Sequence, residues 1–392
     1  MHLAYTDAQE EMRRTLRSYY AELITPEIRA LLDDPETHEP TKRKVVRQMG
    51  ADGWLGIGWP SRYGGKDRGP IDQWIFYDES MRNGVPLPIL TINTVGPQIQ
   101  QHGTEEQKDY FLSRILKGEL DFCIGYSEPD AGTDLASLKT RGVVEGDELV
   151  INGTKLWTSY GTTADWCWLA VRTDPDVKKH RGLSIVLVPM DTPGITPRPL
   201  ELLGEAHPIA EVHYEDVRVP LKNVVGGLNN GWSLITGQLN HERVTLCAPG
   251  MFDSHLADVR RWAQSTKLPD GRRVIDQEWV QLNLAQVHAN LEFLRLQNWK
   301  IACDAESGTL NIEDASTTKV FGTERNLDNV RLLMEVVGQT AYLKKGSPEA
   351  ILSSRLEAAY RSIVILTFGG GVNEVQRDLI TVFGMGMPMV KR

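Results

Sequence analysis

VVEGDELVI, at residues 143–151, is the stretch that indicates the fold class. Two apolar, β-branched runs flank Gly146-Asp147, and this turn sequence between such runs predicts a β-hairpin. The same short-period pattern continues in WCWLAVRT (166–173), LSIVLVPM (183–190) and IAEVHYEDVRVP (209–220), with glycine and proline between the runs. We therefore expect a small middle β domain over residues 121–228.

Helical periodicity lies on the N-terminal side of this β region. Thr6 followed by Gln9, and Thr104 followed by Gln107, predict capping boxes that open helices. The Gly- and Pro-rich stretch 54–70 between them predicts a loop. These features indicate an N-terminal helical domain over residues 1–120.

Helical spacing returns after Gly231. One long apolar stripe recurs at intervals of three and four residues, formed by Leu284, Val287, Leu291 and Leu294. We expect a C-terminal four-helix-bundle domain over residues 229–392, and hence an α+β chain of three parts. This order of elements fits many unrelated proteins and does not identify a function.

Composition limits the function classes. The chain has 392 residues, 41% of them hydrophobic, and a net charge of -9. An acidic balance argues against non-specific nucleic-acid binding. The four cysteines lie far apart without a C-x-x-C pair, which fits neither a disulfide framework nor a zinc site. The sequence has no apolar core of a signal peptide and no run of about 18 apolar residues, so we expect a cytoplasmic protein without membrane insertion or bound metal.

Two segments within the β region carry chemistry. The first is CIGYSEPDAGTDLASLKT (123–140), and the second is INGTKLWTSYGTTADW (151–166). Both resemble signatures of the acyl-CoA dehydrogenase family, in the same order and at similar separation. The resemblance extends over essentially the whole chain, through YGGKDRGPIDQWIFYDE, HGTEEQKDYFLSRILKGE and NEVQRDLI. It implies FAD-dependent removal of two hydrogens from an acyl-CoA thioester, with an electron-transfer protein as acceptor.

The resemblance also implies which residues bind the flavin. A flavin ring needs backbone amides and small hydroxyls near its oxygens and nitrogens when it accepts hydride. The matching positions are Ile124, Tyr126, Ser127, Thr133, Trp157, Thr158 and Ser159. Trp157 is expected against the ring, and Thr133 between the flavin and the thioester substrate. Taken alone, these residues would be read as a hydroxyl-rich loop and a core tryptophan, which the pairing of the two motifs disfavours.

The catalytic base is the main departure from the common family pattern. Dehydrogenation needs a carboxylate to take the α proton and donors to stabilise the enolate oxygen. Many members carry this acid in a C-terminal Y-E-G-T motif, but FGGGVNE (368–374) has Gly370 in its place. Another branch uses an earlier helix with a pattern like L-D-x-E-R, and LNHER (239–243) puts Glu242 there. The resemblance thus implies Glu242 as base; the alternative is a solvated glutamate beside Arg243.

Three neighbouring roles follow from the same resemblance. Arg243 is expected to support the active site, to hold Glu242 ionised and to contact the substrate with Asn240. Gly370 lacks a side chain but keeps its N–H. That amide, with a ribityl hydroxyl of the flavin, is expected to polarise the thioester carbonyl.

The motifs that grip the FAD tail of a neighbouring subunit are altered. Family homotetramers use R-x-x-F-G and Q-x-x-G-G-x-G elements. Here Thr266 replaces the arginine, Glu335 replaces the glutamine, and Gln339 and Ala341 replace glycines. A carboxylate repels a pyrophosphate, and side chains block close backbone approach. The alternative is that Arg272 or Arg273 takes over in an ordinary homotetramer.

One branch of the family pairs two different chains into α2β2 tetramers with fewer FADs than subunits, and acts on steroid (cholesterol) side chains attached to CoA. LNHERV, KVFGTE (319–324), the FGGG segment and the altered tail motifs resemble its base-carrying chain. A second, different dehydrogenase-like chain is therefore the expected partner. A non-catalytic subunit that completes a partner's flavin site, and an acyl-CoA oxidase, are the competing interpretations.

Overall fold

The computed structural model describes residues 4–204, 209–245 and 247–388; for residues 239–245 only the backbone is described. The chain divides into two compact units. We call Met1–Arg29, Arg68–Val85 and Arg243–Arg392 the helical unit, and Ala30–Asp67 and Pro86–Glu242 the sheet unit. This division does not test the three domain boundaries expected from the sequence, which stay a prediction.

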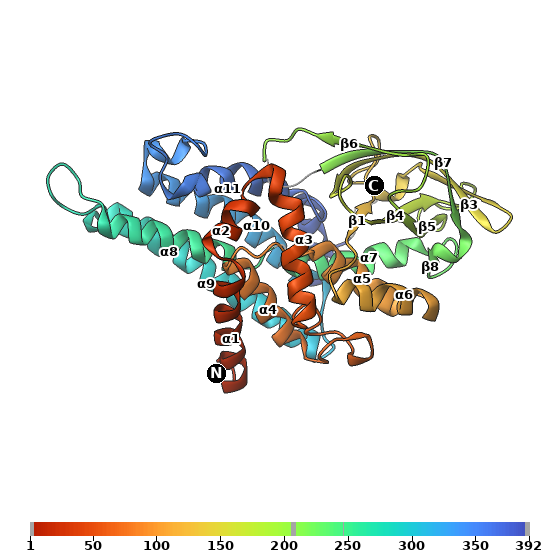
Figure 1. Ribbon diagram of the computed structural model, residues 1–392, viewed down its shortest axis with the longest axis horizontal. Helices are drawn as coiled ribbons and strands as arrows, with labels where there is room; N and C mark the ends of the chain where they lie inside the picture. Colours follow the sequence, from red (N-terminus) through yellow and green to blue (C-terminus); the bar gives the residue numbers. More distant parts are fainter. Residues whose placement is uncertain (1–3, 205–208, 246, 389–392) are drawn as a thin grey trace. The chain divides into compact units, whose positions relative to one another are not determined.

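The sheet unit joins one β-sheet to several helices (Figure 1). Its helices are α3 (Pro35–Ala51), α5 (Gly96–His102), α6 (Glu105–Leu116) and the larger part of α7 (Gly231–Thr245), with the π-helical η2 (Leu90–Val95) before α5. Its strands are β1 (Phe122–Gly125), β2 (Arg141–Glu145), β3 (Glu148–Ser159), β4 (Trp166–Arg172), β5 (Leu183–Pro189), β6 (Ile195–Leu200), β7 (Ile209–Pro220) and β8 (Val224–Val225).

The sheet is mostly antiparallel. Within the described ranges the strand order is β6-β7-β3-β2-β4-β5-β8, and β1 pairs with β4 in parallel. The β2–β3 hairpin turns at Gly146, whose φ of 65° is a backbone conformation that glycine adopts without steric cost. Apolar side chains from β3, β4, β5 and β7 alternate into a buried core on the sheet.

The helical unit is built around two long helices. It contains α1 (Asp7–Leu23), α4 (Pro70–Arg82), α8 (Gly250–Ser265), α9 (Glu278–Glu306), α10 (Ile312–Val337), α11 (Arg355–Ile363) and α12 (Asn373–Leu379), while α2 (Pro26–Leu32) crosses the boundary between the units. The helices α8, α9, α10 and α11 pack together around an apolar core (Figure 1). Asn311 caps α10 by accepting the Asp314 N–H at 2.8 Å, and Gly338 ends it with φ 80° and ψ −151°, a region essentially confined to glycine.

The local sequence predictions are confirmed where the structure describes them. Both capping boxes form, at Thr6 and at Thr104. The hairpin and the three further strands form close to the expected residues. The apolar stripe of Leu284, Val287, Leu291 and Leu294 is buried on α9. β6 was not predicted, because proline alternates along Ile195–Leu200 and proline usually argues against a strand. The loop expected at 54–70 contains one short 3-10 turn, η1 (Ser61–Tyr63), and ends where α4 begins.

Candidate active site

The two sequence motifs lie side by side on the sheet. Ile124 belongs to β1, and the chain leaves this strand through Tyr126 and Ser127. The second motif occupies the end of β3. The Leu156 N–H donates to the Ser127 carbonyl at 2.8 Å, which joins the two motifs directly. Residues 29 positions apart in sequence are therefore held in one local structure.

A buried ion pair between Lys155 and Glu128 links the two motifs. Lys155 and Glu128 lie 2.8 Å apart, and Lys155 also donates to the Tyr126 carbonyl at 3.0 Å. The Glu128 carboxylate accepts two backbone N–H groups, from Lys139 at 2.6 Å and from Thr140 at 2.9 Å. Every acceptor and donor in this cluster comes from one motif or its immediate flank, so the pair sets the shape of the whole site.

Burial and pairing act in opposite directions on these two groups. Burial alone would raise the pKa of the Glu128 carboxyl, but the Lys155 charge and the hydrogen bonds it receives hold that pKa below its usual value. Burial lowers the pKa of the Lys155 ammonium. Sequence reasoning missed this pair. The sequence offered one signal for it. Lys155 is spaced by an even number of residues from Leu149 and Ile151, which places it on the inward face of the strand, where an apolar residue is expected.

The end of β3 is bulged, and this bulge changes the direction of three predicted residues. The β3–β7 register shifts between Lys155 and Thr158. Trp157, inside the shift, has φ 62° and is 55% exposed. A left-handed backbone is costly for a side chain with a Cβ, and such strain concentrates at functional sites. The bulge thus presents a large aromatic face to the outside of the sheet unit.

The hydroxyl groups beside Trp157 differ in environment. Thr158 is fully buried, and its Oγ1 has no hydrogen-bond partner among the described residues. Ser159 is partly buried and pairs with Ile209 across the sheet. Thr133 is exposed on the loop that follows β1 within the first motif. The Thr158 hydroxyl is therefore available to hydrogen-bond a polar group of a bound molecule, as are several other buried side-chain atoms without a described partner.

Tyr126 connects the first motif to α7. Its hydroxyl donates to the Gln238 side chain and accepts the Trp168 indole N–H, the latter at 2.9 Å. Gln238 was not predicted as a site residue, since a lone polar residue in a helix carries no specific signal. This contact anchors the helix that contains three predicted residues, Asn240, Glu242 and Arg243. Their side chains lie outside the described part of the chain.

Gly370 lies in the helical unit, in a tight segment that we call the glycine turn (residues 368–371). The 3-10 helix η8 (Val364–Thr367) ends at it, and the Gly369 N–H bonds to the Ile365 carbonyl at 2.8 Å. Gly370 and Gly371 have φ values of 68° and 95°. Both conformations favour glycine.

The altered tail positions are engaged in local structure. Glu335 accepts a hydrogen bond from Asn283 at 3.1 Å, and Ala341 is buried against the helical core in η6 (Gln339–Tyr342). Thr266 ends α8 by donating its N–H to the Trp262 carbonyl. The two candidate replacements are paired nearby, Arg272 with Asp270 at 2.7 Å and Arg273 with Asp276 at 2.6 Å.

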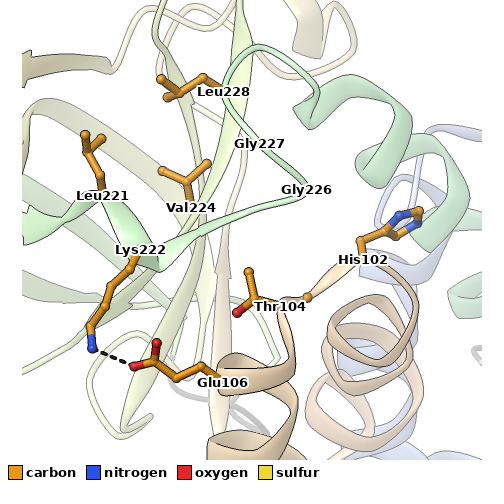
Figure 2. Close-up of a pocket in the computed structure, with 10 residues that line it drawn as sticks. His102, Thr104, Glu106, Leu221, Lys222, Val224, Gly226, Gly227 and Leu228 are labelled. Carbon is orange, nitrogen blue, oxygen red and sulfur yellow. Dashed lines mark hydrogen bonds and ion pairs between the residues drawn. The ribbon is translucent and has the colours of Figure 1, made fainter. Parts of the chain in front are cut away.

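A cavity of about 600 Å³ lies elsewhere on the sheet unit (Figure 2). It is bordered by the start of α6 and by the segment from Leu221 to Leu228. Its Lys222 is paired with Glu106 at 2.7 Å, and Gln107 bonds to the Lys222 carbonyl. None of the predicted site residues lines this cavity, and its Lys222 and Glu106 are paired with each other.

Two absences in the described part of the chain bear on function. Among the described side chains, those of residues 4–204, 209–238 and 247–388, no group of three or more His, Cys, Asp or Glu is arranged to hold a metal ion. No helix in the same described ranges combines the length and the apolar character needed to cross a membrane.

The sheet with its two joined motifs and the long-helix bundle define the class: this chain belongs to the acyl-CoA dehydrogenase family. The family's N-terminal, middle and C-terminal domain models match residues 6–119, 123–217 and 229–383. The chain is therefore an acyl-CoA dehydrogenase, as the sequence predicted.

Several named acyl-CoA dehydrogenases and solved structures are similar to this chain over its whole length. Acyl-CoA dehydrogenase FadE26 of Mycobacterium tuberculosis is 50% identical, and FadE29 of the same organism is 44% identical, with 100% of each chain covered. A chain in the crystal structure of the ChsE4-ChsE5 complex from Mycobacterium tuberculosis has a TM-score of 0.92 at 51% identity, again with 100% of both chains covered. A chain of the Tcur3481-Tcur3483 steroid ACAD has a TM-score of 0.93 at 44% identity and the same coverage.

Proposed function

We propose that this chain is the base-carrying chain of a two-chain, FAD-dependent dehydrogenase that acts on steroid side-chain CoA thioesters, with Glu242 as the base. The observation that carries the assignment of the base is the glycine turn. Gly370 occupies the position where many family members carry the acid, and its φ is 68°. A glutamate there would have a left-handed backbone, which costs about 1–2 kcal/mol. The turn is therefore built for glycine, and an acid must come from elsewhere.

The residues of the bulged strand fit a flavin ring. Trp157 offers an exposed aromatic face, and the adjacent Thr158 has a buried hydroxyl without a partner among the described residues. A ring stacked on the tryptophan would supply polar edge atoms for that hydroxyl. When bound, FAD would supply the acceptor for the β hydrogen. Ile124, Tyr126, Ser127 and Ser159 flank the same place.

In this proposal the chain's own residues bind the substrate, accept the α proton and stabilise the charge on the thioester oxygen. Glu242 takes the proton from the α carbon, and Arg243 favours its ionised form. The Gly370 N–H donates to the thioester oxygen, where negative charge develops as the proton leaves. Asn240 and Thr133 contact the substrate. The Lys155–Glu128 pair keeps the flavin-side loops in shape, so that the ring and thioester are held in register.

The base is tested by Glu242→Gln. This variant should keep its flavin but lose about 10²–10⁴-fold in turnover, because proton abstraction loses its acceptor. Glu106→Gln, an exposed glutamate on α6, is the matched control and should keep full activity. Retention of more than roughly a tenth of the wild-type rate by Glu242→Gln would refute the base assignment and favour the non-catalytic subunit. Turnover with oxygen as the sole acceptor would instead indicate an oxidase.

The two-chain arrangement is supported by the tail positions. Glu335 and Ala341 are committed to local contacts, and Arg272 and Arg273 are paired with neighbouring aspartates. A site for a neighbour's pyrophosphate would need these groups to rearrange. A partner chain with intact tail motifs removes that need.

An apolar stripe on α9 also supports a partner. Its large side chains are exposed at helical spacing: Trp279, Leu282, Phe293 and Leu296. Spacings of three, eleven and three residues place them on one side of the helix. Aligned exposed apolar side chains are typical of helix-to-helix interfaces. We assign this stripe to a second dehydrogenase-like chain.

Counting FAD tests the assembly. The chain purified alone should hold little flavin, and adding the partner should raise flavin content towards roughly one FAD per two unlike chains, with a matching rise in Tm. Leu282→Lys with Leu296→Lys should block assembly, while Leu203→Lys, at an exposed leucine of the sheet unit, should not. A stable homotetramer with one FAD in each chain would overturn the heteromer but not the dehydrogenase.

The steroid substrate rests on the 44% identity to the steroid ACAD. The two-chain enzyme should show a kcat/KM at least about tenfold higher for a steroid side-chain CoA thioester than for a straight-chain thioester with the same reacting carbons. Equal values would remove the steroid assignment. Reoxidation by an electron-transfer protein rather than by oxygen is the expected second half of the reaction.

A further inference from the structure

A second buried lysine spans the glycine turn. Lys319 lies on α10 and is fully buried. Its ammonium donates to the carbonyl oxygens of Thr367 at 3.1 Å and Gly371 at 2.7 Å, and to the Asn373 Oδ1 at 2.7 Å. The first acceptor precedes the turn, the second belongs to its last residue, and the third follows it. The cation therefore pins the two ends of the turn together.

The third acceptor is itself held in place. The Asn373 amide nitrogen donates to the Thr323 hydroxyl and to Glu324, each at 3.1 Å. Thr323 and Glu324 lie on α10, one turn after Lys319, and Arg377 of α12 pairs with Glu324 at 2.7 Å. The start of α12 is thus fastened to the same face of α10 as the turn. Neither end of the turn is left to the freedom of its glycines.

The turn needs such a fastening. A run of three glycines has many backbone conformations of similar energy, so it does not select one orientation for its N–H groups. A fully buried ammonium is costly unless its donors are satisfied, and here the satisfied geometry exists only when the turn has its described shape. Any other conformation of the turn would leave the buried ammonium without acceptors, so the contacts of Lys319 favour the described conformation.

We propose that Lys319 is a positioning residue for the Gly370 amide. It sets the direction of the N–H that polarises the thioester, so that the α proton becomes acidic enough for the base. This inference rests on the proposed function, because it requires the Gly370 amide to contact the thioester. It extends that function to a residue on α10 that touches neither flavin nor substrate.

The test uses the two-chain holoenzyme and a 3-thiaacyl-CoA. This probe has an acidic α proton but cannot give a hydride from its sulfur position, so its bound anion is detected by a long-wavelength absorbance band with the flavin. In Lys319→Met the pH midpoint of this band should rise by about one unit or more, because the polarising donor is misaligned. kcat should fall by about tenfold or more with a smaller change in KM.

The matched control is Lys42→Met. Lys42 is also a buried lysine, paired with Asp121 at 2.8 Å, but it lies on α3. It should lower the Tm without moving the midpoint. If Lys319→Met lowers the Tm and leaves the midpoint at the wild-type pH, Lys319 is a structural residue only and the inference fails. If the wild-type enzyme binds the probe without any band, the proposed function fails instead.

A second variant keeps the test decisive if Lys319→Met does not assemble. Asn373→Ala removes one acceptor and leaves the two carbonyl contacts of Lys319. It should raise the midpoint in the same direction by a smaller amount, about half a unit. An unchanged midpoint in an assembled, flavin-loaded Asn373→Ala enzyme overturns the inference.

Discussion

Each unit contains a fully buried lysine beside a loop that we propose for the site, and the contacts described for the two lysines differ in charge. In the sheet unit Lys155 is paired with a carboxylate, that of Glu128. In the helical unit the contacts described for Lys319 go to neutral oxygen atoms at the ends of the glycine turn. The first loop is held by charge against charge, and the second by a cation against backbone and amide dipoles.

This difference determines how each loop responds to acid. A carboxylate can be protonated, so the contribution of the Lys155–Glu128 pair to stability depends on pH. Carbonyl and amide oxygens do not titrate in the accessible range. The flavin-side loops should therefore lose more stability in acid than the direct contacts of Lys319 with the glycine turn. The Glu324 carboxylate, which accepts a hydrogen bond from Asn373, is the titratable group described next to the turn.

The largest effect is expected from Lys155→Met. Breaking the pair leaves Glu128 buried without its counter-ion, which should destabilise the chain by about 3–5 kcal/mol in urea unfolding and abolish flavin retention. Adding Glu128→Gln should recover part of the loss, since it removes the buried charge. Its single amide oxygen can replace only one of the two carboxylate oxygens that accept the Lys139 and Thr140 N–H groups. A cost below about 1 kcal/mol for the single change would mean that the pair does not hold the motifs.

The pH dependence of the free energy of unfolding should also differ between variants at Lys155 and at Lys319. The folded pKa of Glu128 is lowered, so the stability from this group is present above its unfolded pKa, near 4.5, and is lost as pH falls through the folded value. The stability difference between wild type and the Lys155→Met/Glu128→Gln double variant should therefore shrink as the pH falls below about 4.5. Urea unfolding at several pH values measures it.

The Lys319→Met variant provides the contrast. Its stability difference from wild type should change less over the same acid range, because the Thr367, Gly371 and Asn373 oxygens that accept from Lys319 do not titrate. A parallel decline in both variants would show that the acid response comes from elsewhere in the chain.

The sequence predicted the elements better than the contacts between them. Capping boxes and the Gly146-Asp147 hairpin are local patterns, and each depends on residues within a few positions. The Lys155–Glu128 pair joins residues 27 positions apart, and Lys319 meets the glycine turn across about 50. Such pairings depend on strand register and helix packing, which no local pattern encodes.

The site residues show the same division. The motifs located Trp157 and Thr158, because their residue types are tied to a resemblance. The φ of 62° at Trp157 and the unpartnered Thr158 hydroxyl could not be read from the sequence, since a bulge arises from the pairing of β3 with β7. The assignment of Glu242 as the base stays a prediction, because its side chain lies outside the described part of the chain.

Gly370→Ala tests the strain in the helical unit. At φ 68° a Cβ is unfavourable, so this change should cost about 1–2 kcal/mol and lower the rate, even though alanine adds only a methyl group. Gly132→Ala is the control. Nothing lies within 4 Å of a Cβ at Gly132, and its φ is not positive, so this variant should stay within about 0.5 kcal/mol of wild type. Equal costs at the two positions would contradict the account of the turn.

The smallest expected effect on folding comes from Trp157, where the sign is informative. Because the side chain is 55% exposed and φ is 62°, Trp157→Gly loses little packing and relieves the backbone, whereas Trp157→Ala keeps the strain. The glycine variant should therefore be more stable than the alanine variant by about 1 kcal/mol in urea unfolding, while both lose flavin. At Val144, an exposed β2 residue without positive φ, the order should reverse, since glycine weakens an ordinary strand. Alanine equal to or better than glycine at position 157 would mean that the bulge stores no strain, and that the exposed tryptophan is held there by packing rather than reserved for a flavin.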